Sequence, residues 1–69
     1  MEGKLSVEKG KDGFIFVEFA VERKEDVNAL TLDMIGMGLD VLYEPKNMSE
    51  KYESCVLCNE KIGIKITYV

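Results

Sequence analysis

Two cysteines set three positions apart are the residues of this chain whose types and spacing could do chemistry. Cys55 and Cys58 are the only cysteines among the 69 residues, and the chain contains no histidine. A Cys-x-x-Cys pair can hold zinc, form a redox dithiol or consist of two ordinary strand residues. Each alternative predicts a different kind of protein, and the residues around the pair help to decide among them.

A complete zinc site needs four ligands, and one cysteine pair supplies only two of them. Two chains could pool their pairs, so a dimer clasped by zinc through Cys55 and Cys58 is one alternative. A redox pair needs its first cysteine at a helix N-terminus, whereas Val56 and Leu57 within the motif favour a strand. Residues three apart on a strand point to opposite faces. The pattern therefore favours two packing residues, Cys58 in the core and Cys55 on the opposite face, with no cofactor.

The charged residues offer no other catalytic arrangement. There are 13 acidic and 9 basic residues, giving a net charge of −4, and no spacing isolates a pair of acids. A His-dependent triad is excluded because histidine is absent, and so short a chain has difficulty enclosing a substrate pocket of several hundred Å³. We therefore expect a protein that is not an enzyme.

The distribution of charge also bears on partners. The basic residues are scattered between acids, and a protein that binds phosphates needs a clustered basic surface. Direct nucleic-acid binding is therefore disfavoured. The acidic balance leaves open a second alternative, an acidic nucleic-acid mimic that occupies a DNA-binding protein.

Length and hydropathy predict one small domain over residues 1–69. About 46% of the residues are apolar and 32% are charged, which is ordinary for a folded domain. No apolar run approaches the roughly 20 residues that cross a bilayer, and the first residues do not resemble the core of a signal peptide. We expect a cytoplasmic protein without a membrane partner.

Periodicity predicts two strands and a helix in the first half of the chain. Apolar residues alternate over 4–8 and 14–22, and the glycine-rich turn at 10–13 predicts an antiparallel hairpin between them. The period becomes helical over 24–37, and Gly38 is suited to end the helix. The expected buried stripe is Val27, Leu30, Met34 and Met37, widened by Thr31 and Ile35.

The second half of the chain predicts three further strands. A short strand over 39–43 is expected to end at Pro45, because proline cannot donate to a ladder, and 48–51 is expected to form one helical turn. The tail predicts a hairpin of 52–58 and 62–69, whose short loop would place Val56 beside Ile64, Ser54 beside Ile66 and Tyr52 beside Tyr68. The order ββαβββ predicts an α+β two-layer sandwich, a mainly antiparallel sheet of about five strands with one helix on one face.

Spare apolar residues then provide a functional hypothesis. Phe14 and Phe16 lie on the sheet face opposite the expected core, and Leu32 and Gly36 lie on the helix opposite its buried stripe. Exposed apolar surface beside absent catalytic chemistry favours binding. We therefore expect a small acidic regulatory module, homodimeric, that acts by binding a protein partner through these four residues. Inhibition of that partner is one form that the regulation could take.

Overall fold

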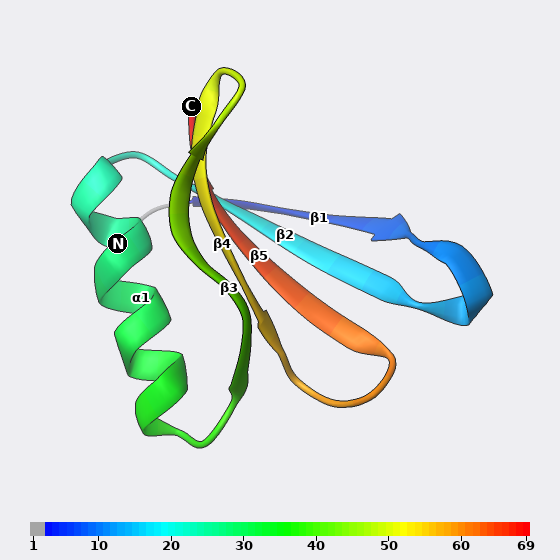
Figure 1. Ribbon diagram of the computed structural model, residues 1–69. Coiled ribbons are helices and arrows are strands. Elements are labelled where there is room, and N and C mark those ends of the chain that lie inside the picture. The colour runs from blue at the N-terminus through cyan, green and yellow to red at the C-terminus, as the bar shows by residue number, and fades with distance from the viewer. Residues whose placement is uncertain (1–2) are drawn as a thin grey trace.

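The computed structural model describes residues 3–69, which form a five-stranded sheet with one helix on one face (Figure 1). The strands and the helix are β1 (Gly3–Lys9), β2 (Ile15–Val21), α1 (Lys24–Gly36), β3 (Asp40–Met48), β4 (Lys51–Leu57) and β5 (Ile62–Tyr68). Across the sheet the order is β1-β2-β5-β4-β3. The pair β2–β5 is parallel and the other three neighbouring pairs are antiparallel. The predicted ββαβββ two-layer α+β fold is confirmed.

Strands β1 and β2 form the predicted antiparallel hairpin. A short 3-10 turn at Lys11–Gly13 joins them, and Asp12 (φ 58°) and Gly13 (φ 76°) both adopt left-handed backbone there. Such angles suit glycine and aspartate. The resulting register places Leu5 opposite Phe19 and Val7 opposite Val17, so these residues share one face of the sheet.

Helix α1 ends as the sequence predicts. Gly38 has φ 94°, its N–H donates to the carbonyl of Ile35 at 3.0 Å, and the N–H of Leu39 donates to Met34 at 3.1 Å. These two bonds form a Schellman cap, which satisfies carbonyls that the helix leaves free. Met37 lies beyond the last turn and is exposed, so its predicted place in the buried stripe is wrong.

The other members of the stripe divide between core and surface. Val27 and Thr31 are buried, and Leu30 and Met34 pack against the core formed by Val21, Val27 and Ile66. Ile35 is exposed instead of widening the stripe. Within residues 3–69, α1 is neither long enough nor apolar enough to cross a membrane.

Strand β3 corrects two predictions. It continues through Pro45 to Met48, although the sequence indicated an end near Tyr43. Proline is tolerated here because β3 is an edge strand and its register with β4 shifts between Tyr43 and Lys46. The predicted helical turn at 48–51 is also wrong, since Met48 pairs directly with Lys51 across a tight turn.

The last two strands form the predicted hairpin in the predicted register. Val56 lies opposite Ile64, Ser54 opposite Ile66, and Tyr52 opposite Tyr68. This register turns Ile64 and Ile66 toward α1, where Ile66 is completely buried. The core therefore lies between α1 and the β5–β4 side of the sheet.

Candidate protein-binding surface

One helix covers only part of one face of this sheet. A helix with its side chains is about 10 Å wide, whereas five strands spaced by about 4.8 Å span about 19 Å between the outer strand axes. Helix α1 packs mainly on β4, β3 and β5 and meets β2 only slightly. In Figure 1, β1 and β2 extend away from α1. Val21 at the end of β2 belongs to the core, but the helix-side face of β1 and of the first half of β2 is left uncovered.

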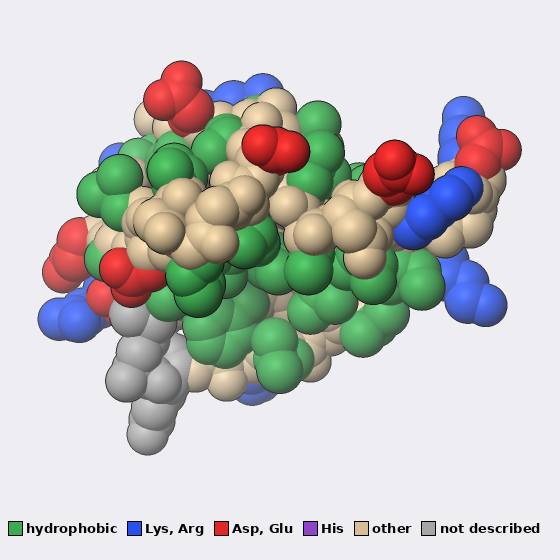
Figure 2. Space-filling view, turned by 90° about the horizontal axis from the view of Figure 1, so that it is seen from below, with side chains coloured by type: hydrophobic (Ala, Val, Ile, Leu, Met, Phe, Trp, Pro, Cys, Tyr) green, Lys and Arg blue, Asp and Glu red, His purple; other side chains and the backbone are tan. Residues whose placement is uncertain are grey.

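The uncovered part of the helix-side face carries five apolar side chains, which we call the apolar half-face. Its members are Leu5, Val7, Ile15, Val17 and Ile62. Leu5 is 71% exposed and Val7 is 68% exposed, while the other three are half-buried. Figure 2, which views the molecule from below, shows hydrophobic side chains gathered over the middle of the view, with charged side chains around its margin.

Sequence reasoning missed the apolar half-face as a surface. The side of the second strand opposite Phe14 and Phe16, which carries Ile15 and Val17, was expected to be core, and the register brings Leu5 and Val7 to this same side. The available signal was the presence of one predicted helix beside five predicted strands. One helix about 10 Å wide cannot cover a sheet of five strands, and the N-terminal hairpin is the part most distant from it.

The aromatic pair predicted as a binding site lies on the opposite, helix-free face. The rings of Phe14 and Phe16 have centroids 4.8 Å apart, and the Lys65 Nζ lies 4.5 Å from the centroid of the Phe16 ring. Phe16 also packs closely on Gly63, where an added Cβ would lie 3.0 Å from its ring. Both aromatic side chains are consequently half-buried.

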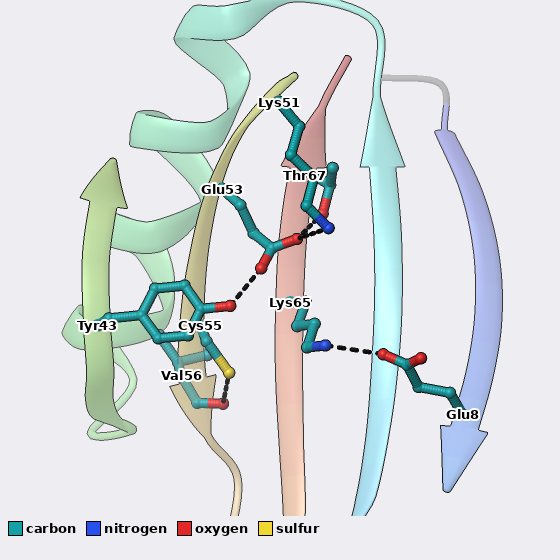
Figure 3. Close-up of polar contacts among 8 residues, drawn as sticks. All are labelled: Glu8, Tyr43, Lys51, Glu53, Cys55, Val56, Lys65 and Thr67. Atoms are coloured by element: carbon teal, nitrogen blue, oxygen red, sulfur yellow. Dashed lines mark hydrogen bonds and ion pairs between the residues drawn. The ribbon is translucent and has the colours of Figure 1, made fainter. Parts of the chain in front are cut away.

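A lysine links this aromatic pair to the edge of the sheet. The Lys65 Nζ donates to the Glu8 Oε1 at 2.7 Å (Figure 3). This hydrogen bond raises the pKa of Lys65, so Lys65 stays charged while its ammonium group shields Phe16. The helix-free face is therefore mixed in character, in contrast to the apolar half-face.

The two predicted helix residues lie together on the outer surface of α1. Leu32 is 67% exposed, and a Cβ built at Gly36 would meet no heavy atom within 4 Å among the described residues. Between α1 and β3 lies an open hollow of ≈ 270 Å³. It is lined by Asn28, Thr31, Leu32, Ile35, Glu44 and Pro45. The predicted residues thus form two separate groups, the aromatic pair on one face and Leu32 with Gly36 on the helix.

The cysteines occupy the reverse of their predicted environments. Cys55 is 0% exposed, whereas Cys58 lies exposed beyond the end of β4. Cys55 does lie on the face opposite α1, as predicted, because it pairs with Tyr43 and Lys65 there. Burial raises the pKa of the Cys55 thiol. A shared metal ion would require Cys55 to leave this enclosed position.

A buried carboxylate organises the helix-free face near Cys55. Glu53 is 1% exposed, and it accepts hydrogen bonds from the Tyr43 hydroxyl and from Thr67 Oγ1, the latter at 2.8 Å. The Lys51 Nζ lies 3.1 Å from the same carboxylate (Figure 3). Among the described residues, every buried side-chain nitrogen and oxygen has a hydrogen-bond partner.

The pKa values within this network follow from burial and hydrogen bonding. Burial alone would raise the pKa of Glu53, but the hydrogen bonds from Tyr43, Thr67 and Lys51 outweigh it and hold that pKa below its usual value. Burial, reinforced by the bond to Glu53, raises the pKa of Tyr43. At neutral pH the network is an ionised carboxylate satisfied by its donors, an arrangement that stabilises the sheet.

Comparisons of the chain with protein-family models, with curated proteins and with solved structures found no match.

Proposed function

We propose that this chain is a small, acidic, non-enzymatic protein-interaction module that works as a homodimer and regulates a protein partner by binding it. The observation that carries the proposal is the apolar half-face. Exposed apolar side chains grouped on one face of a small domain mark sites of protein association. The net charge of −4 favours a partner with a basic surface.

The small core gives a second reason for association. The buried hydrophobic residues of the described chain are Val21, Val27, Cys55, Val56 and Ile66. In a domain of this size, the hydrophobic core rarely contributes more than about 3–5 kcal/mol to the net free energy of unfolding. Complete burial of a leucine or valine side chain adds about 1.5–3 kcal/mol, so covering Leu5 and Val7 would strengthen a marginal fold substantially.

Sedimentation equilibrium tests the proposal. Wild type should be dimeric, and the double variant Leu5→Thr/Val7→Thr should weaken the dimer at least about tenfold, equivalent to about 1.4 kcal/mol. Threonine preserves strand propensity while removing apolar surface. The control, Met37→Gln, changes an equally exposed residue outside the apolar half-face and should leave the dimer unchanged.

Two results would contradict the proposal. A wild-type chain that stays monomeric at all accessible concentrations would remove the homodimer. A dimer unaffected by Leu5→Thr/Val7→Thr would remove the apolar half-face as its interface. The same runs with chelator separate this dimer from one clasped by zinc through Cys55 and Cys58, since only the latter would dissociate.

A further inference from the structure

The two edges of the sheet differ in their capacity to pair with another strand. Strand β3 carries Pro45 and register shifts on either side of Tyr43, and both features discourage further pairing. Strand β1 has an unbroken register with β2 from Gly3 to Lys9, and all seven of its residues are exposed. The β1 edge is therefore the one suited to accept a strand.

The register of the first hairpin fixes which backbone groups of β1 are free. The N–H of Gly10 donates to the carbonyl of Phe14 at 2.7 Å, so Gly10 faces its partner strand. Because this orientation alternates along an antiparallel strand, Ser6 directs its backbone groups toward β2. Leu5 and Val7 direct theirs outward, to the free edge.

The side chains along β1 form a self-complementary series. From Lys4 to Glu8, successive side chains are basic, apolar, small and polar, apolar, and acidic. We propose that β1 pairs in antiparallel fashion with β1 of a second copy about a twofold axis at Ser6. Lys4 then lies opposite the partner's Glu8, and Leu5 lies opposite the partner's Val7.

This register satisfies backbone and side chains together. The outward groups of Leu5 and Val7 meet the outward groups of the partner's Val7 and the partner's Leu5, as an antiparallel ladder requires. If the register slipped by one residue, the outward backbone groups of one β1 strand would lie opposite residues of the other whose backbone groups point inward to β2, and the ladder could not form. In the next permitted registers, Leu5 faces the partner's Leu5 or Val7 faces the partner's Val7. Neither register places Lys4 opposite the partner's Glu8.

The inference deepens the proposed function, and rests on it, because it names the geometry of the same homodimer. Residues opposite each other in an antiparallel pair share a face. The two sheets would therefore join edge to edge with both helices on one side. Leu5 and Val7 would be covered at the junction by the partner's Val7 and the partner's Leu5, and the rest of the two apolar half-faces would become a single surface. Glu8 would contact the partner's Lys4 from the position in which it already binds Lys65.

Cysteine trapping tests the register. Ser6 would face the partner's Ser6 in a non-hydrogen-bonded pair with Cα atoms about 4.5 Å apart, a separation that a disulfide accepts. In a Cys58→Ser background, Ser6→Cys should form a covalent dimer at least about tenfold faster than Lys4→Cys, because pre-association raises the effective concentration of the thiols. Mixing Lys4→Cys with Glu8→Cys chains should restore trapping.

Charge exchange provides an independent test. Lys4→Glu makes the strand acidic at both positions, and Glu8→Lys makes it basic at both, so each homodimer contains like-charge pairs. A mixture should form a heterodimer about tenfold tighter than either homodimer, and native mass spectrometry would detect it well above the statistical half. Glu60→Lys mixed with wild type is the control for nonspecific attraction, since Glu60 is exposed in the β4–β5 loop.

The outcomes separate this inference from the proposed function. Edge pairing is overturned if Ser6→Cys traps no faster than Lys4→Cys and the two charge variants show no preference for the heterodimer. The half-face proposal still stands in that case, provided that Leu5→Thr/Val7→Thr breaks the dimer. In a dimer whose two apolar half-faces packed on each other, Val17→Thr would also weaken association. An edge-paired dimer should tolerate the same substitution. A monomeric wild type overturns both.

Discussion

Glu53 illustrates how a single charged side chain shapes the helix-free face. It is 1% exposed and bridges three strands through Tyr43 on β3, Lys51 on its own strand and Thr67 on β5. An ionised carboxylate without these donors would be costly to bury. With them, it ties the edge strand β3 to the centre of the sheet on the face that α1 does not cover.

Replacing this carboxylate should lower stability in a pH-dependent way. Glu53→Gln should reduce the free energy of unfolding by about 1–3 kcal/mol at pH 7, since it puts an amide donor among hydroxyl and ammonium donors. The pKa of Glu53 is lowered by folding. Its contribution is therefore present above the unfolded-state pKa of about 4.3 and is lost as the pH falls through the lower folded-state value.

Urea unfolding at several pH values measures this effect. The difference between wild type and Glu53→Gln should narrow as the pH falls below about 4. Glu60→Gln, which changes an exposed carboxylate in the β4–β5 loop, should alter stability by no more than about 0.5 kcal/mol. A difference between wild type and Glu53→Gln that stays constant down to acidic pH would mean that folding does not lower the pKa of Glu53.

At the scale of the elements, two glycines near the end of α1 should respond oppositely to alanine. Gly38 has φ 94°, which costs a residue with a Cβ about 1–2 kcal/mol. Gly36 is helical and has free space around it among the described residues, so Gly36→Ala should stabilise by up to about 1 kcal/mol. Thermal unfolding of the two variants checks the signs, and stabilisation by Gly38→Ala would contradict the Schellman cap.

The elements also show which features sequence patterns can predict. The β4–β5 register followed from strict alternation and a short loop, and the end of α1 followed from Gly38. The extension of β3 past Pro45 did not, because the cost of proline depends on whether its strand lies at an edge. Edge position is a tertiary property that local periodicity does not contain.

The candidate surface was harder to predict for a related reason. Alternation correctly separated Phe14 and Phe16 from Ile15 and Val17, but it could not say which face would be covered. Coverage depends on where α1 crosses the sheet, and its position over β3, β4 and β5 leaves Leu5 and Val7 exposed. The cysteine environments were reversed because Cys58 lies past the strand end, where alternation stops.

At the scale of the whole molecule, pairing through β1 would create a surface that neither chain has alone. The helices lie on the far strands of each sheet, so they would flank a central floor made of both apolar half-faces. Such a floor suits the apolar side of a partner protein's helix. Dimerisation would then form the binding site for the regulated partner, and the acidic charge would orient a basic one.

If the homodimer also stabilises the fold, stability must depend on protein concentration. Each tenfold increase above the dissociation constant adds about 1.4 kcal/mol per dimer, which for a domain of this size should raise the melting temperature by about 3–6 °C. Calorimetry over a hundredfold concentration range would measure the slope. Leu5→Thr/Val7→Thr should flatten it and Met37→Gln should retain it. A wild-type melting temperature independent of concentration would mean that the small core folds without the second chain.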